Sequence, residues 1–213
     1  AKAVKAGAEG VGLFRTEFLF LNKNALPTEE EQFEEYKKAA VLTKGMPLTI
    51  RTLDIGGDKD IPYMGLTKET NPFLGYRAIR FCLDRVDIFT TQLRAILRAS
   101  AYGSIRIMIP MITSVNEVRQ VKDMIKKICS DLDHNGISYD KNIQTGVMIE
   151  TPAAAIMADA IAQEVDFFSI GTNDLTQYTI AVDRCNENVA YLYSAFNPAV
   201  LRLIRRIIAV SYT

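Results

Sequence analysis

The sequence predicts an α/β protein built as an incomplete (β/α)8 barrel. Three observations lead to this fold class. Short apolar segments alternate with amphipathic ones, charged side chains follow directly after the apolar segments, and 213 residues are too few for a complete barrel. A complete barrel typically needs about 250 residues. We expect one partial barrel domain over residues 1–213, with about five strands.

Five short, mostly apolar segments that end in polar or turn residues predict the strands. They cover residues 11–15, 48–54, 105–110, 146–150 and 167–171. Residues 171–174 (GTND) have the composition of a polar loop after the last strand.

Amphipathic segments between the strands predict helices. Thr28 and Glu31 form the pattern of a capping box, which begins a helix that Gly45 ends. Later helices are predicted over residues 88–100, 114–132, 153–164 and 198–209.

Alternating strands and helices fit either a doubly wound sheet or a barrel. Polar residues favour the barrel, because they follow different strands instead of gathering at one switch point. These residues are Arg15, Arg51, Asp54, Glu150 and Asp174. The glycines of residues 7–12 precede a strand, so they do not form a dinucleotide-binding loop.

Composition sets broad bounds on function. The 25 basic and 25 acidic residues balance, so no overall charge draws the chain to nucleic acid. No apolar stretch is long enough to span a membrane and no signal peptide is recognisable, which favours a cytoplasmic protein. The three cysteines form no CxxC pair and are expected to be free thiols. We expect Cys82 and Cys129 to be small buried residues. Cys185 follows Arg184 and is the only cysteine near a candidate site residue, but burial or chance explains its position better than a chemical role.

A carboxylate lies at or just after the end of two predicted strands. Glu150 ends the strand over residues 146–150, and Asp174 follows the strand over residues 167–171. Crowded carboxylates repel one another at neutral pH unless a cation or proton lies between them. Carboxylate oxygens suit a hard ion, so the sequence suggests Mg²⁺ as a cofactor.

Five motifs, in order along nearly the whole chain, resemble the C-terminal phosphoenolpyruvate-binding barrel domain of the Enzyme I family of the bacterial sugar phosphotransferase system. They are residues 10–19 (GVGLFRTEFL), 51–59 (RTLDIGGDK), 71–77 (NPFLGYR), 147–153 (VMIETPA) and 170–178 (IGTNDLTQY).

The resemblance implies a substrate site and a metal site. Phosphoenolpyruvate would contact Arg15, Arg51, Arg77, Asn173, Asp174 and Arg184, and Mg²⁺ would be bound by Glu150 and Asp174. Several arginines suit this ligand, because planar guanidinium groups bind phosphate and carboxylate oxygens bidentately.

In the family, the phosphoryl group passes to a histidine on a separate N-terminal domain. It then passes to the histidine phosphocarrier protein for sugar uptake, and the family forms homodimers through this domain. The only histidine here, His134, does not resemble the phosphoacceptor, and no cysteine has the neighbours of the family's proton donor. The sequence therefore resembles a truncated domain without catalytic residues, which we expect to be inactive alone.

Two other functions compete with this reading. One is a catalytically silent module for phosphoenolpyruvate binding or dimerisation, and the other is a Mg²⁺-dependent pyruvate aldolase of the same barrel group. The number of arginines separates the aldolase from the others, because pyruvate needs only one for its carboxylate.

Single residues also have simpler readings. Arg15 and Glu17 can form a surface ion pair, and Glu150 can cap the helix at Pro152. Lys59 stays open between phosphate binding and a solvated loop position. Three further arginines are read as the polar side of helical segments: Arg85, Arg94 and Arg98.

Overall fold

The computed structural model describes residues 5–21, 23–56, 61–65 and 69–211. The chain divides into two compact units. Unit 1 comprises Ala1–Met108 and Val121–Gln144, and unit 2 comprises Ile109–Gln120 and Thr145–Thr213. Whether residues 1–213 form a single domain stays a prediction.

The strands of unit 1 are β1 (Val11–Arg15), β2 (Leu48–Arg51) and β3 (Ile105–Ile109), the last of which ends at the unit boundary. β1 pairs with β2, and β2 with β3, both in parallel. Every residue of β2 is buried, as expected for a strand flanked on both sides in a parallel sheet. β1 is more open, since Val11 and Leu13 are exposed. The β1–β2 register brings Arg15 opposite Arg51.

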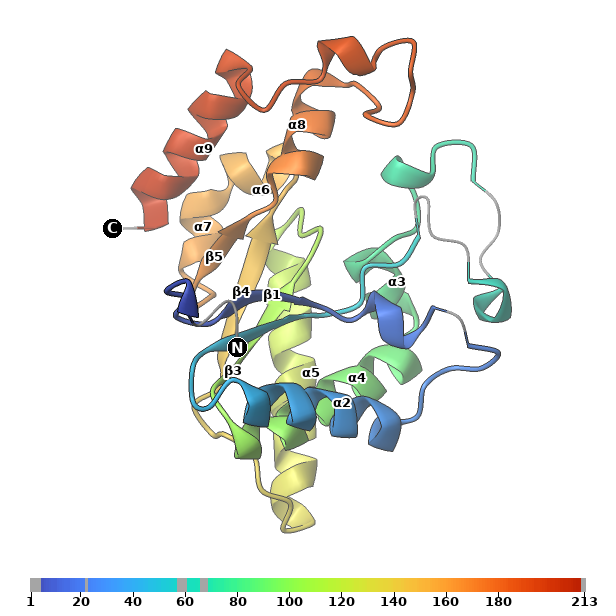
Figure 1. Ribbon diagram of the computed structural model, residues 1–213, viewed down its shortest axis with the longest axis vertical. Coiled ribbons are helices and arrows are strands. Elements are labelled where there is room, and N and C mark those ends of the chain that lie inside the picture. Colours follow the sequence, from blue (N-terminus) through green and yellow to red (C-terminus); the bar gives the residue numbers. More distant parts are fainter. Residues whose placement is uncertain (1–4, 22, 57–60, 66–68, 212–213) are drawn as a thin grey trace. The chain divides into compact units, whose positions relative to one another are not determined.

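Two long helices of unit 1 lie side by side, α2 (Glu29–Leu42) and α4 (Val86–Ala99) (Figure 1). The predicted capping box of α2 is confirmed: the Thr28 hydroxyl accepts from the Glu31 N–H, and the Glu31 carboxylate accepts from the Thr28 N–H. α3 (Ile79–Asp84) precedes α4 and packs on it. Short 3-10 helices occupy Glu17–Leu19, Pro62–Met64, Pro72–Leu74 and Ser100–Tyr102.

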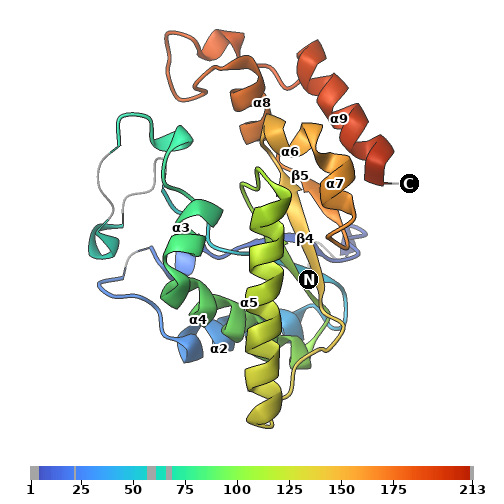
Figure 2. The ribbon, with the colours of Figure 1, turned by 180° about the vertical axis from the view of Figure 1, so that it is seen from behind.

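α5 (Val115–His134) is the long helix near the centre of Figure 2. It agrees with the predicted helix over residues 114–132. In unit 2, β4 (Gln144–Ile149), whose first residue belongs to unit 1, pairs in parallel with β5 (Phe168–Ile170). Both strands start and end within three residues of the predicted bounds. No helix among the described residues is both long and apolar enough to cross a membrane.

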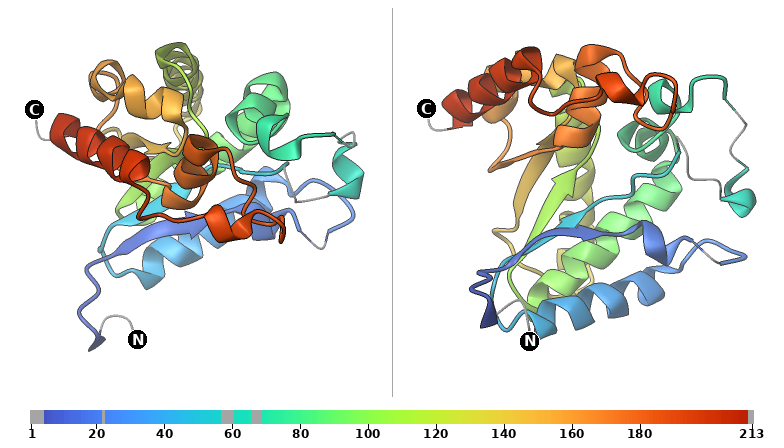
Figure 3. Two further views of the ribbon diagram at one scale, coloured as in Figure 1. Left: turned by 90° about the horizontal axis from the view of Figure 1, so that it is seen from above. Right: turned by 45° about the horizontal axis from the view of Figure 1, so that its top comes forward.

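The helices of unit 2 are α6 (Pro152–Ile156), α7 (Ala158–Ala162), α8 (Thr172–Ile180) and α9 (Pro198–Ser211), with a 3-10 helix at Ala190–Leu192. α9, the red helix in Figure 3, packs on the other three. The single helix predicted over residues 153–164 is wrong: Met157, with a ψ of 15°, divides it into α6 and α7. The loop predicted at residues 171–174 is also wrong, because Thr172 already begins α8.

The predicted fold class is confirmed. Five strands alternate with helices among the described residues, and they pair in parallel within each unit. Five strands are an incomplete set for a barrel of eight.

Candidate functional site

Three arginines and two carboxylates meet in unit 1 at the carboxyl ends of β1 and β2. We call this group the arginine cluster: Arg15, Glu17, Arg51, Asp54 and Arg77. Arg15 and Arg51 are the last residues of paired strands, Glu17 begins the 3-10 helix after β1, and Asp54 lies in the loop after β2. Arg77 precedes α3.

Opposite charges alternate along the arginine cluster. Arg51 Nη2 contacts Glu17 Oε1 and lies 3.1 Å from Asp54 Oδ2. Asp54 Oδ1 lies 3.0 Å from Arg77 Nη2. Glu17 Oε2 lies 3.5 Å from Arg15 Nε. The three guanidinium groups and two carboxylates leave a formal charge of +1, which suits an anionic ligand.

Burial divides the arginine cluster into a core and one accessible cation. Glu17, Arg51, Asp54 and Arg77 are all buried, whereas 58% of the Arg15 side chain is exposed. Buried charges are costly unless each has a partner of opposite sign, which explains the two carboxylates. Arg15 and Glu17 therefore form more than the surface pair considered above, because the glutamate is buried and shared with Arg51.

Backbone geometry brings Arg77 to the loop after β2. A Cβ atom on Gly56 would lie 2.6 Å from the Tyr76 carbonyl oxygen and 2.7 Å from Arg77 Cβ, so only glycine allows this approach. Ala78, next to Arg77, has a φ of 50°. Such a backbone is unfavourable for alanine, so the surrounding structure must stabilise it.

In unit 2, the Glu150 carboxylate follows β4 and is buried. Its Oε1 accepts the N–H of Met111 at 2.7 Å, and Met111 itself has a positive φ of 58°. The alternative that Glu150 caps the next helix is wrong. Thr151 is the N-cap of α6, and its hydroxyl accepts the N–H of Ala154.

Glu150 lies against the start of α8. A Cβ on Gly171, the N-cap of α8, would lie 2.6 Å from both Cβ and Oε2 of Glu150, so a side chain there would displace the carboxylate. Asp174 is in the first turn of the same helix and is buried. The partial positive charge of a helix N-terminus favours both carboxylates.

The other predicted residues of unit 2 surround Asp174. Arg184 Nη1 lies 3.3 Å from Asp174 Oδ1, and the Arg184 N–H donates to Gln177. Asn173 is exposed, and its carbonyl oxygen accepts from the hydroxyl of Tyr193 at 3.2 Å. Unit 2 thus collects Glu150, Asn173, Asp174 and Arg184, while unit 1 collects Arg15, Arg51 and Arg77.

The carboxylates of Glu150 and Asp174 fit Mg²⁺ better than a transition metal. Among the described residues, no three acidic, cysteine or histidine side chains come together as a metal cage. Mg²⁺ does not need one, because it keeps several waters and is commonly held by one or two carboxylates together with substrate oxygens. Glu150 and Asp174 supply two such groups.

Residues read as structural behave accordingly. Arg85 pairs with Asp87, Arg94 with Glu29 and Asp131, and Arg98 with Glu29 and Glu30. All three cysteines are free thiols; Cys82 is buried, Cys129 is half-buried and Cys185 is exposed, so burial does not explain the position of Cys185. Lys59 lies outside the described residues.

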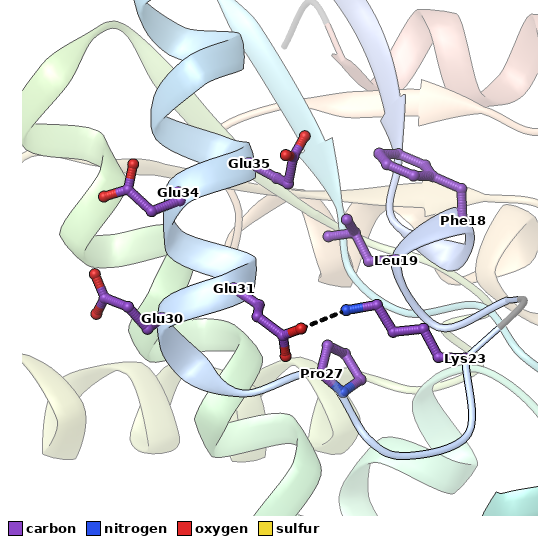
Figure 4. Close-up of a pocket in the computed structure, with 8 residues that line it drawn as sticks. All are labelled: Phe18, Leu19, Lys23, Pro27, Glu30, Glu31, Glu34 and Glu35. Carbon is purple, nitrogen blue, oxygen red and sulfur yellow. Dashed lines mark hydrogen bonds and ion pairs between the residues drawn. The ribbon is translucent and has the colours of Figure 1, made fainter.

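A cavity of about 510 Å³ in unit 1 has the wrong charge for an anionic substrate (Figure 4). Phe18, Leu19 and Pro27 form its apolar part. Its polar residues are Lys23, Glu30, Glu31, Glu34 and Glu35. Lys23 pairs with Glu31 at 2.8 Å, and Arg98 and Lys37, which do not line the cavity, pair with Glu30 and Glu34. The four carboxylates still outnumber these cations, so the lining keeps a net negative charge that repels an anion.

Sequence reasoning missed the partners of the arginines. Glu17 was considered only as a surface partner of Arg15, and Asp54 was noted at a strand end without a role. A signal was present, because both carboxylates lie within three residues of an arginine at a strand end.

The whole chain, residues 1–213, matches the family described as PEP-utilising enzyme, PEP-binding domain. The chain belongs to this family. Its relatives include proteins named phosphoenolpyruvate-protein phosphotransferase. That of Buchnera aphidicola subsp. Acyrthosiphon pisum (strain APS) is 59% identical over 99% of this chain and 37% of its own length. Those of Haemophilus influenzae and Priestia megaterium are 56% and 55% identical over 99% and 97% of this chain, and 36% of each relative.

This PEP-binding domain spans little more than a third of the length of these relatives. The strand-end arginines and carboxylates are thus found in a domain whose family description names phosphoenolpyruvate (PEP) as the ligand.

Proposed function

We propose that this chain is the Mg²⁺-dependent phosphoenolpyruvate-binding part of a phosphoenolpyruvate-protein phosphotransferase. In the whole enzyme, the phosphoryl group would pass to a protein histidine and then to the histidine phosphocarrier protein, for sugar uptake. The arginine cluster is the main support, because it combines three guanidinium groups, a net charge of +1 and one accessible cation.

Phosphoenolpyruvate carries a phosphate and a carboxylate on three carbons, so its site needs several fixed cations. Arg15 is the accessible guanidinium and binds an incoming phosphate oxygen first. Arg51 and Arg77 are fixed in orientation by Glu17 and Asp54, so little side-chain freedom is lost when they bind. Fixed cations also stabilise charge that develops on the phosphoryl group and the departing enolate.

Glu150 and Asp174 would hold the magnesium ion in unit 2. When bound, Mg²⁺ would neutralise oxygens of the phosphate and the carboxylate. Asn173 is exposed beside Asp174, where its amide can donate to a phosphate oxygen. Arg184, now paired with Asp174, supplies a further guanidinium.

The residues present do not identify a phosphoryl acceptor or an acid. His134 is exposed at the end of α5, and Cys82 is buried, which raises the pKa of its thiol and keeps it protonated. We therefore propose that the chain alone binds substrate without turning it over. The second candidate is a catalytically silent binding module. The exposed His134 and the buried Cys82 favour it for the isolated chain, because neither serves as the phosphoryl acceptor or the acid. A pyruvate aldolase is less favoured, because one carboxylate does not need three guanidinium groups.

We also propose a cytoplasmic homodimer. Free thiols are typical of a reducing compartment. Tyr191 and Phe196 expose 81% and 83% of their surface, and large exposed aromatic residues are common where proteins associate.

Calorimetric titration with phosphoenolpyruvate, with and without Mg²⁺, tests the proposal. We expect binding with the metal and much weaker binding without it. Pyruvate, which lacks the phosphate, should bind more weakly in both cases. Equal affinity for the two ligands would favour the aldolase, and binding unaffected by Mg²⁺ would remove the metal from the proposal.

A further inference from the structure

The apolar side of α4 contains one completely buried amide, the side chain of Gln92. Its relative exposure is 0%, and its neighbours Phe89, Leu93 and Ile96 are all core residues. An amide in such a place is unfavourable unless its polar atoms are hydrogen-bonded. A leucine would fill the same space without that requirement.

Gln92 bonds to the two chain segments that carry the arginines. Its Oε1 accepts the N–H of Leu53 at 2.8 Å, and its Nε2 donates to Thr16 Oγ1 at 3.2 Å. The same Nε2 donates to the hydroxyl of Tyr36 at 3.2 Å. Burial raises the pKa of Tyr36, so its hydroxyl stays protonated and donates onward to Gln32.

These bonds fall where the β1–β2 ladder ends. The last paired residues are Arg15 and Arg51. The Thr52 N–H donates to Met108 on the β3 side, so the Arg51 carbonyl and the Leu53 N–H face the β1 side. β1 has already turned into the 3-10 helix at Glu17.

Two side chains replace the missing strand backbone. The Thr16 hydroxyl donates to the Arg51 carbonyl at 3.0 Å, and Gln92 takes the Leu53 N–H. The chain after β2 therefore keeps the Arg51 carbonyl and the Leu53 N–H hydrogen-bonded beyond the last β1 partner, while β1 leaves immediately after Arg15. This divergence lies directly after the Arg15–Arg51 pair, where the Glu17 carboxylate contacts both arginine side chains.

We propose that Gln92 is a positioning residue of the phosphate-binding arginine cluster. It holds the backbone next to Arg15, Arg51 and Asp54 through Thr16 and Leu53, without touching the ligand. The inference rests on the proposed function and extends it to a residue of α4.

Two variants of the 213-residue chain separate positioning from general core stability. Gln92→Leu keeps the volume and removes the bonds to both strand ends. Tyr36→Phe removes two buried hydrogen bonds of the same network, those of its hydroxyl with Gln92 and Gln32, but leaves the bonds of Gln92 to Thr16 and Leu53 intact. Two quantities are measured in folded samples: phosphoenolpyruvate affinity by calorimetry and, without ligand, the NMR signal of the Arg51 Nε–H group.

We expect Gln92→Leu to weaken phosphoenolpyruvate binding about tenfold or more, since displacements of about 1 Å have large effects on a site. It should also shift the Arg51 signal. Tyr36→Phe should leave the phosphoenolpyruvate affinity and the Arg51 signal nearly unchanged. Equal effects of the two variants, or no shift of the Arg51 signal in Gln92→Leu, would overturn the proposal.

If Gln92→Leu does not fold, Thr16→Val, which removes the hydroxyl bonded to Arg51, is measured in its place with the same expectations. Absence of phosphoenolpyruvate binding by the unchanged chain would refute the proposed function instead. The ligand-free Arg51 signal would then decide alone whether Gln92 positions the cluster.

Discussion

The carboxylate of Glu17 contacts the guanidinium of Arg51 across 34 positions of sequence, and the two side chains are only 3% and 7% exposed. Glu17 also lies 3.5 Å from Arg15, so one buried carboxylate serves two arginines at neighbouring strand ends. Its negative charge permits two positive charges to lie close together before any ligand arrives.

Glu17→Gln should lower the free energy of unfolding by about 3 kcal/mol, because removing one partner leaves a buried charge without full compensation. Glu34→Gln is the matched control. Glu34 lies in α2, is 55% exposed and pairs with Lys37, and its loss should cost less than about 1 kcal/mol. Urea denaturation measures both. If Glu17→Gln lowers the free energy of unfolding no more than Glu34→Gln does, solvent or Asp54 already compensates the charge of Arg51.

Arg15→Ala should weaken phosphoenolpyruvate binding at least about tenfold, the effect of losing a charged hydrogen bond of about 1.5–3 kcal/mol. Stability should change little, because 58% of the Arg15 side chain is exposed. Pyruvate affinity should fall much less. Arg119→Ala is the control, since its side chain is 65% exposed and pairs with Glu164. Equal losses for phosphoenolpyruvate and pyruvate by calorimetry would show that Arg15 does not bind the phosphate.

Asp174→Asn should greatly reduce the effect of Mg²⁺ on ligand binding, because a neutral amide replaces an anionic oxygen ligand. Asp159→Asn is the control: Asp159 also occupies the first turn of a helix, so both changes remove a charge that favours a helix N-terminus. A magnesium titration of each variant by calorimetry separates the loss of a metal ligand from the loss of a charge at a helix N-terminus. An unchanged titration in Asp174→Asn would exclude this carboxylate as a ligand.

Local patterns predicted the elements that depend on nearby residues. The capping box at Thr28 and the strands that bear Arg15 and Arg51 follow from spacing and turn residues within a few positions. The start of α8 was misread for a physical reason: glycine, threonine and asparagine favour turns and helix starts alike.

The partners of the arginines needed the tertiary structure. Glu17 and Arg51 meet only because β1 and β2 pair in one particular register, and nothing local fixes that register. The role of Gln92 could not be predicted either. In the sequence, one amide among the apolar residues of a helix is expected at the border between the buried and the exposed side. The strand-end arginines were recognisable by position, but the groups that orient them were not.

Glu31 should make stability depend on pH in the acid range. Its pKa is lowered from 4.5 to about 2, first by the hydrogen bond from Lys23 and then by the N–H and hydroxyl of Thr28. A carboxyl with a depressed pKa stabilises the fold above its unfolded pKa, and this contribution is lost as the pH falls from about 4.5 through about 2. The cause is the capping box together with the Lys23–Glu31 pair drawn in Figure 4.

Urea denaturation of the unchanged chain and of Glu31→Gln, at about pH 6 and about pH 3, tests this dependence. The variant should be less stable at the higher pH. The difference should shrink at the lower pH, because the Glu31 carboxyl of the unfolded chain is then protonated while that of the folded chain is still mostly charged. Lys23→Gln removes the largest cause, so it should reproduce part of the loss while the cap remains. Glu35→Gln is the control, because Glu35 lines the same cavity in α2 but lies outside the capping box. A Glu31→Gln difference that stays constant between the two pH values would mean that the carboxylate charge does not stabilise the cap.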